Sequence, residues 1–267
     1  MALSSSLSLS APLVSRLDVL EQCTSTNTEL VERAAQGWPH FSAVVTDDQT
    51  GGRGRLGRTW VAPPGRTLAI SVLLRPAFSA ESFGWLPLIA GLAMARAVRG
   101  ALADDDSPAA ASVGVKWPND VLIAGNKVSG LLAELVAGPA VVLGAGVNLA
   151  FAADELPTPT ATSLTVEGAR GDGLPDRVLS VYLSELRAAY DQLVRHNGDA
   201  VAAGLADAVA AECVTLGRDV RLTLPSGEEP VARALEIDEY GRLIVRRADD
   251  GTRMTIAAGD VTHVRDE

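Results

Sequence analysis

Apolar and polar positions follow two different periods along this chain, which predicts a mixture of strands and helices. Because only short turns separate the later β-rich runs, we expect those runs to pair as antiparallel strands. The β-rich runs lie at 16–19, 43–47, 68–74, 113–117, 121–124, 128–136 and 141–149. The helical patterns cover 24–37, 80–102, 176–195 and 198–213.

The pattern changes after Gly217, where short strands alternate with turn-forming residues. Turns are expected at 225–227, 239–241 and 249–251, and the tail is therefore predicted to form a small all-β barrel. Residues 150–174, rich in Pro, Thr, Ala and Gly, predict a mobile loop. The organisation that we expect is a flexible leader (1–15), an α+β domain with a mixed or antiparallel sheet (16–214) and a small β domain (215–267).

The composition is that of a globular protein that can bury a core. Hydrophobic residues make up 47% of the 267 residues, and charged residues make up 21%. Lys and Arg total 23 against 33 Asp and Glu, and this net charge of -10 argues against a protein that binds nucleic acid through phosphate contacts. The leader has no basic segment, the longest apolar stretch (85–95) is short for a membrane span of about 20 residues, and the two cysteines lie in no pairing motif. A cytoplasmic protein is expected.

A glycine-rich loop reverses the sign of charge, because residues 49–80 hold five arginines and no carboxylate. Its glycines at 52, 54 and 57 spell GxGxxG, but Pro63 and Pro64 exclude the helix that must follow in a dinucleotide-binding motif. What remains is a flexible loop with Arg53, Arg55 and Arg58, whose guanidinium groups suit a carboxylate or phosphate. The alternative is an exposed loop whose arginines pair with surface acids.

A second polar cluster is predicted at the hairpin that begins at Lys116. This hairpin presents Asn119 and Asp120 at its turn, and Lys127 follows on the next strand. A lysine within an apolar run needs a partner for its ammonium group, so the cluster suggests a polyanion with a metal ion. The small residues of Gly144–Asn148 are expected to leave room for a ligand.

Five blocks of the sequence together resemble one family, the biotin–protein ligases. They occur in the order of that family, as STN (Ser25–Asn27), QTGGRGRLGRTW (Gln49–Trp60), KWPND (Lys116–Asp120), KVSGLLAE (Lys127–Glu134) and GAGVN (Gly144–Asn148). The resemblance implies a class II synthetase-like catalytic domain followed by an SH3-like C-terminal domain. Because the first block begins at Ser25, the sequence resembles the enzyme-only form without an N-terminal DNA-binding domain.

The resemblance also implies a reaction and a set of site residues. Biotin reacts with ATP and Mg²⁺ to give biotinyl-5′-AMP, and a lysine of a biotin carboxyl carrier domain then accepts the biotin. Lys127, Arg55 and Asp120 are the expected catalytic residues, with Asp120 also the expected metal ligand. The expected biotin-binding residues are Ser25, Thr26, Asn27, Gln49, Gly52, Arg53, Arg55, Lys127, Gly130 and Gly144. The expected ATP-binding residues are Arg53, Arg55, Arg58, Trp60, Lys116, Asn119 and Asn148.

Two other functions and several partners follow from the same residues. A ligase for lipoate or another acyl group is the alternative enzyme, and a sensor that holds biotin or its adenylate without turnover is the alternative binding protein. The expected partner is the carrier domain of an acyl-CoA or pyruvate carboxylase, with neither nucleic acid nor membrane. A monomer or a weak homodimer is expected, and strand 141–149 could lie at a sheet edge and pair with a second subunit.

Overall fold

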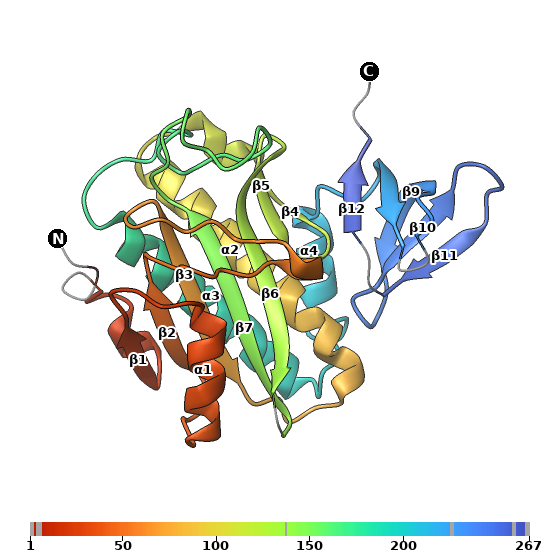
Figure 1. The fold of residues 1–267 in the computed structure, drawn as a ribbon. Coiled ribbons are helices and arrows are strands. Elements are labelled where there is room, and N and C mark those ends of the chain that lie inside the picture. The colour runs from red at the N-terminus through yellow and green to blue at the C-terminus, as the bar shows by residue number, and fades with distance from the viewer. Residues whose placement is uncertain (1–2, 4–6, 137, 225–226, 258–259, 265–267) are drawn as a thin grey trace.

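A seven-stranded mixed sheet forms the centre of the larger domain in the computed structural model, which describes residues 3, 7–136, 138–224, 227–257 and 260–264 (Figure 1). β1 and β2 are parallel, and every other neighbouring pair is antiparallel. The short turns predicted the antiparallel pairing of the strands from β4 to β7. The strand order is β1-β2-β3-β7-β6-β5-β4. The bounds are β1 (Arg16–Val19), β2 (Ser42–Thr46), β3 (Thr67–Leu74), β4 (Val113–Lys116), β5 (Asp120–Ile123), β6 (Asn126–Val136) and β7 (Ala140–Asn148).

The expectation that the strand at 141–149 could lie at a sheet edge is wrong. β7 pairs with β3 on one side and with β6 on the other, and all nine of its residues are buried. A strand that is apolar along its whole length buries both faces, which is the pattern of a central strand. β1 and β4 are the end strands of this sheet.

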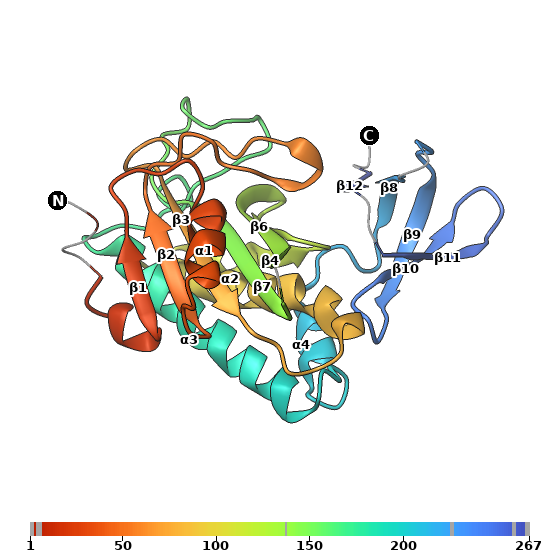
Figure 2. The ribbon, with the colours of Figure 1, turned by 60° about the horizontal axis from the view of Figure 1, so that its bottom comes forward.

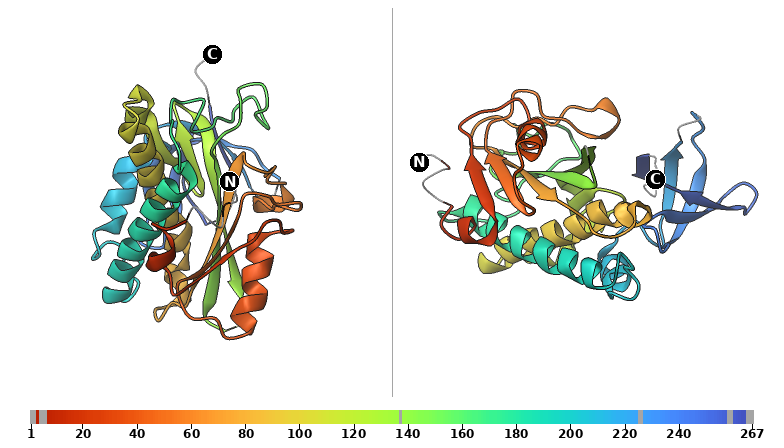
Figure 3. Two further views of the ribbon diagram at one scale, coloured as in Figure 1. Left: turned by 90° about the vertical axis from the view of Figure 1, so that its left-hand side faces the viewer. Right: turned by 90° about the horizontal axis from the view of Figure 1, so that it is seen from below.

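Helices cover the two faces of the sheet unequally (Figure 3). On one face lie α2 (Trp85–Asp104), α3 (Leu174–Arg195) and α4 (Leu205–Glu212), and on the other lies α1 (Thr26–Ala35). Side chains alternate between these layers, so that Val44 and Val142 pack with Leu30 of α1 while Val45 and Leu143 join the larger core. This alternation explains why β2, β3 and β7 are buried throughout.

The helical segment Ala80–Asp104 is long and apolar enough to cross a membrane by length and composition, which the short apolar stretch at 85–95 did not predict. In the structure 72% of its apolar window is buried within the protein. It lies against the sheet and packs closely along α3, which is the position of a core helix.

Two expected segments differ from the structure at their ends. Residues 7–15 of the expected flexible leader are held to the domain, since Ser10 Oγ donates to Asp176 Oδ1 at 2.5 Å and Arg187 Nη2 donates to the Leu13 carbonyl at 2.9 Å. The helix expected over 198–213 begins only at Leu205. The Asp199 carboxylate accepts backbone N–H groups two and three residues ahead, which forms a turn in place of the first helical residues.

A five-stranded antiparallel sheet forms the C-terminal domain, with β11 and β12 as its end strands. The turns expected at 239–241 and 249–251 join its strands, while residues 225–226 of the third expected turn lie outside the described residues. The arrangement is consistent with an SH3-like barrel, although the described strands do not close it. The strands are β8 (Asp219–Thr223), β9 (Val231–Ile237), β10 (Leu243–Arg247), β11 (Arg253–Ile256) and β12 (Asp260–His263), in the order β11-β10-β9-β8-β12.

Candidate active site

The glycine–arginine loop passes over the part of the sheet that contains β6 (Figure 2). Residues of both the loop and the sheet line a cavity of about 1010 Å³. Of the site residues expected from the sequence, all except Gly52 line it. The two lysines, the only ones in the chain, both line it. The lining residues that the sequence predicted are Ser25, Thr26, Asn27, Gln49, Arg53, Arg55, Arg58, Trp60, Lys116, Asn119, Asp120, Lys127, Gly130, Gly144 and Asn148.

Gly52 supports the loop from behind the cavity wall. Its carbonyl accepts the backbone N–H of Trp60 at 2.9 Å, and a Cβ at this position would collide with the Trp60 carbonyl. The backbone N–H of Gly54 donates to the Arg58 carbonyl at 2.7 Å, and a single 3₁₀ turn (Arg55–Gly57) lies between them. The loop is therefore a small hairpin whose glycines allow close approach of the backbone.

A buried chain of neutral hydrogen bonds forms one end of the cavity. The Gln49 side-chain oxygen accepts the backbone N–H of Thr26 at 2.8 Å. Ser71 Oγ lies 2.8 Å from Thr26 Oγ1 and 2.6 Å from Asn27 Oδ1. Ser25 occupies the N-cap position of α1, but its side chain makes no capping bond. This end can therefore offer both donors and acceptors to a neutral polar ligand.

Glu134 extends this chain to the arginine loop, and sequence reasoning gave it no role. Its Oε2 accepts from Asn27 Nδ2 at 2.5 Å and lies 3.2 Å from Arg53 Nη2. The pairing of loop arginines with acids, weighed as the alternative for this loop, thus holds for Arg53. The signal was a carboxylate within the strand block KVSGLLAE. Ser71 gave a similar signal, as a polar residue within an apolar strand.

A charged centre lies at the other end of the cavity, where the β4–β5 hairpin meets β6. Lys127 Nζ is 2.7 Å from Asp120 Oδ1, and Arg55 Nη1 donates to Asn119 Oδ1 at 3.0 Å. A Cβ on Gly130 would lie 3.0 Å from Lys127 Nζ, so this glycine leaves space for the ammonium group. The arrangement places two cations and one carboxylate together in a partly buried setting, where charges act more strongly than in water.

Trp60 and Asn148 also line the cavity. The indole of Trp60 rests on Gly146, where a Cβ would collide with the ring. Trp60 Nε1 and Asn148 Oδ1 are buried and have no hydrogen-bond partner within the described part of the chain. Asn148 Nδ2 donates to the Thr162 carbonyl at 2.9 Å. Both residues line the cavity, but these two polar atoms are covered, with Trp60 Nε1 against Gly146.

Two further segments complete the wall, and neither was assigned from the sequence. Within the loop 150–174, the Thr160 carbonyl accepts the Lys127 backbone N–H at 2.7 Å, so that this part of the loop lies along β6. Arg218 and His263 enter from the C-terminal domain. Burial, together with the nearby positive charges of Lys116 and Arg218, lowers the pKa of His263 to about 4.

Comparison with known proteins identifies the family of this chain. The Biotin/lipoate A/B protein ligase family model matches residues 19–148, and the Biotin protein ligase C terminal domain matches residues 215–264. The chain is 41% identical to the biotin–[acetyl-CoA-carboxylase] ligase of Mycobacterium tuberculosis, over 94% of this chain and 90% of that protein. It is 34% identical to the bifunctional ligase/repressor BirA of Escherichia coli, over 65% of this chain and 53% of that protein.

Solved structures show the same fold. Biotin protein ligase from Aquifex aeolicus in complex with biotin and ATP is similar with a TM-score of 0.73 and 27% identity, over 94% of this chain and 100% of that chain. Biotin protein ligase from Leishmania major in complex with biotinyl-5-AMP gives a TM-score of 0.62 and 27% identity, over 91% and 99% of the two chains. Since its sequence matches a curated ligase over nine-tenths of both chains, this protein belongs to the biotin protein ligase family.

Proposed function

We propose that the chain activates biotin with ATP to form biotinyl-5′-AMP and then transfers the biotin to a lysine of a biotin carboxyl carrier domain. The observation that carries this proposal is the division of one cavity into a neutral hydrogen-bonding end and a charged centre. Biotin has the same two ends, since its ureido group is neutral and its carboxylate is the reacting anion. ATP would meet that carboxylate at the charged centre.

Biotin recognition would fall to the neutral end and to the arginine loop. Ser25, Thr26 and Gln49 would bond the ureido group, whose N–H groups donate and whose carbonyl accepts. Asn27, Gly130 and Gly144 would shape the slot in which biotin lies. Arg53, on the hairpin that begins at Gly52, would lie toward the carboxylate and phosphate.

The first step joins two anions, so the protein must reduce their mutual repulsion. Lys127 and Arg55 would provide fixed positive charge beside the carboxylate oxygen that attacks the α-phosphorus. The new bond is the mixed anhydride, the bond from the α-phosphorus to its bridging oxygen breaks, and pyrophosphate leaves. Before substrate arrives, Asp120 satisfies the Lys127 ammonium at 2.7 Å.

The nucleotide would lie against Trp60 and Asn148, which line the cavity and whose Nε1 and Oδ1 atoms have no hydrogen-bond partner among the described residues. Arg58 and Lys116 line the same cavity and would bind the phosphates, with Asn119 beside Arg55.

Mg²⁺ would enter with the nucleotide. Among the described residues, no three His, Cys, Asp or Glu side chains form a metal cluster. Mg²⁺ commonly uses one or two protein carboxylates together with phosphate oxygens and water, so Asp120 alone is a sufficient protein ligand. When bound, the ion would neutralise charge on the phosphate oxygens.

The second step needs a neutral amine on the acceptor lysine. That amine attacks the carbonyl carbon of the mixed anhydride, AMP leaves, and Asp120 would help to remove the proton. The acceptor would be the carrier domain of an acyl-CoA or pyruvate carboxylase in the cytoplasm, and the enzyme would act as a monomer or weak homodimer without nucleic acid. We place the domain boundary between residues 214 and 215.

Exchange of labelled pyrophosphate into ATP tests this proposal. We expect exchange that requires biotin and Mg²⁺ and that lipoate does not support. Exchange with lipoate would favour the alternative acyl ligase. Tight binding of biotinyl-5′-AMP without any exchange would instead favour the sensor.

A further inference from the structure

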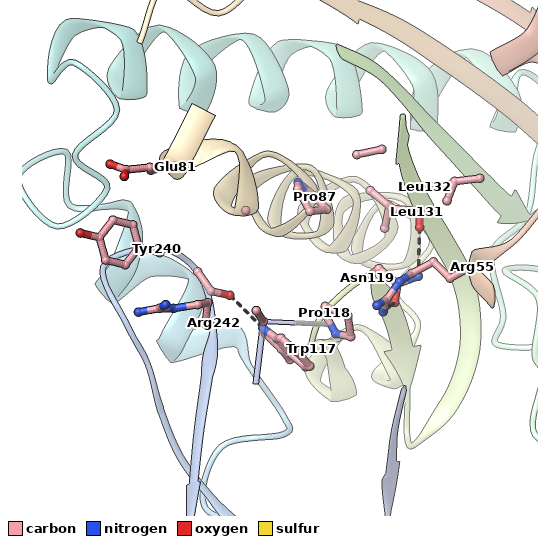
Figure 4. A pocket seen from close by; sticks show the side chains of 14 residues that line it. Arg55, Glu81, Pro87, Trp117, Pro118, Asn119, Leu131, Leu132, Tyr240 and Arg242 are labelled. Atoms are coloured by element: carbon pink, nitrogen blue, oxygen red, sulfur yellow. Dashed lines mark hydrogen bonds between the residues drawn. The ribbon is translucent and has the colours of Figure 1, made fainter. Parts of the chain in front are cut away.

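Trp117 lies in the hairpin of the charged centre, yet its two polar hydrogens are both bound by the C-terminal part of the chain. Its side chain is buried, and its indole Nε1–H donates to the Gly241 carbonyl at 3.0 Å (Figure 4). Its backbone N–H donates to Thr215 Oγ1 at 3.1 Å. Both acceptors fall within residues 215–264, which match the C-terminal domain model. Trp117 therefore connects the two domains at the site.

The acceptor turn of the C-terminal domain is well fixed. The Asp238 carboxylate accepts the backbone N–H groups of Tyr240 at 3.0 Å and Arg242 at 2.9 Å. Gly241 has φ +81°, and a Cβ there would lie 3.0 Å from the Gly84 carbonyl at the start of α2. In return, a Cβ on Gly84 would collide with the Tyr240 carbonyl. The turn and the catalytic domain therefore meet backbone against backbone.

A second tryptophan docks on the same turn without belonging to the hairpin. Trp85, fully buried at the start of α2, donates its indole N–H to the Glu239 carbonyl at 2.7 Å. Trp85 and Trp117 thus make equivalent bonds to neighbouring carbonyls of one turn. Only Trp117 also belongs to the segment that carries the charged centre.

The hairpin that contains Trp117 borders a second cavity, so the hydrogen bonds from Trp117 to the C-terminal domain matter more for its position. A separate cavity of about 480 Å³ lies between the turn and the hairpin, lined in part by Trp117, Tyr240 and Arg242 (Figure 4). Arg55 and Asn119 line both this cavity and the larger one. The cavity leaves the hairpin less packing on this side, so the hydrogen bonds of Trp117 add to the core packing in fixing its position.

We propose that Trp117 is a positioning residue, through which the C-terminal domain holds Asn119 and Asp120 in place for the adenylation step. Asn119, two residues along, accepts from Arg55 Nη1 at 3.0 Å, and Asp120 pairs with Lys127 at 2.7 Å. The domain thereby acts on the reaction independently of any contact that it makes with substrate. This inference rests on the proposed function, because its readout is biotin-dependent exchange.

Two phenylalanine substitutions test the proposal in the full-length chain. Trp117→Phe and Trp85→Phe each remove one indole donor from the same turn, so both should lower the melting temperature. We expect only Trp117→Phe to reduce kcat for exchange, by roughly tenfold or more, because displacement of Asn119 and Asp120 slows the reaction. The KM for biotin should change by less than about twofold. Equal losses of kcat in the two variants, or normal kcat in Trp117→Phe, would overturn the proposal.

A glycine pair provides a second test that does not alter either tryptophan. Gly241→Ala adds a methyl group that must displace the turn from Gly84, whereas Gly251→Ala, at φ +73° on another turn of the domain, meets nothing within 4 Å. Both variants carry the same kind of backbone strain. A fall in kcat in Gly241→Ala alone supports the proposal, and this pair decides the matter if Trp117→Phe unfolds. If the wild-type chain shows no exchange, the proposed function is contradicted. If the wild type is active and the two glycine variants have the same kcat, only the role of Trp117 is contradicted.

Discussion

Replacement of Lys127 by alanine should nearly abolish biotin-dependent pyrophosphate exchange without unfolding the chain. The change has two electrostatic effects, because Lys127 Nζ lies 2.7 Å from Asp120 Oδ1. It removes a cation from the place where two anions meet. It also leaves the Asp120 carboxylate, only 17% exposed, without its partner and facing incoming phosphate.

Coulomb's law gives the size of these effects. Two unit charges ~5 Å apart interact by about 3 kcal/mol at an effective dielectric constant of about 20. The lost attraction is therefore at most about 3 kcal/mol, because the Lys127 side chain is 36% exposed and solvent screens its charge. The repulsion from Asp120 exists in the wild type as well and does not add to this value. The loss of rate is therefore up to roughly a hundredfold. Exchange kinetics at saturating biotin and ATP measure it, with circular dichroism as the control for folding.

The double variant Lys127→Ala/Asp120→Asn separates the two effects. If the unpaired carboxylate repels phosphate and does not hold Mg²⁺, the double variant should be roughly tenfold faster than Lys127→Ala alone. A double variant slower than the single one would show that Asp120 acts chiefly as a metal ligand. Near-normal exchange by Lys127→Ala would refute the role of this lysine altogether.

Two further predictions concern residues outside the expected site. Glu134→Ala should raise KM for biotin about tenfold, because Asn27 loses its carboxylate partner. Glu134→Gln should have a KM close to that of the wild type, since its amide oxygen still accepts from Asn27 and the exposed ion pair with Arg53 contributes at most about 1 kcal/mol. Equal KM in the wild type and both variants would contradict this role. Burial and nearby cations hold the pKa of His263 near 4 in the folded chain. As the pH falls below about 6.5, His263 is therefore protonated in the unfolded chain before it is protonated in the folded one. The free energy of unfolding should fall between pH 6.5 and 4, by up to about 3 kcal/mol. Thermal melts across this range should show a weaker acid dependence in His263→Gln, and an unchanged dependence would exclude this histidine as the cause.

Local pattern predicted most strands and helices of this fold because each one carries its own signal. Alternating runs reflect burial of one strand face, and the apolar runs of β2, β3 and β7 reflect burial of both faces; a short window reveals either pattern. The start of α4 was missed because residues 200–203 suit a helix. The Asp199 carboxylate, bonded to two backbone N–H groups, and Gly204, left-handed at φ 69°, instead hold a turn. The leader was misjudged because its anchor, Asp176, lies more than 160 residues away.

Strand order required information that no single segment contains. The position of β7 between β3 and β6 joins segments about seventy residues apart, so turn lengths alone could not place it. Its composition nevertheless held a clue, since an uninterrupted apolar strand indicates burial on both faces. Similarly, the roles of Arg218 and His263 in the cavity wall depend on how the two domains meet.

The glycines of β7 show why the sequence predicted which residues belong to the site better than it predicted which atoms they contact. Their small size was expected to leave room for a ligand, but the space above Gly144 is taken by Asn27 and that above Gly146 by Trp60. A glycine in a strand indicates that another group of the protein or a ligand approaches the backbone closely, but its position in the sequence does not identify that group. Here the approaching groups are themselves site residues, because Asn27 belongs to the hydrogen-bonded chain that reaches Glu134 and Trp60 lines the cavity. The glycines therefore act on ligand binding indirectly, by allowing the side chains that line the cavity to lie flat against the sheet.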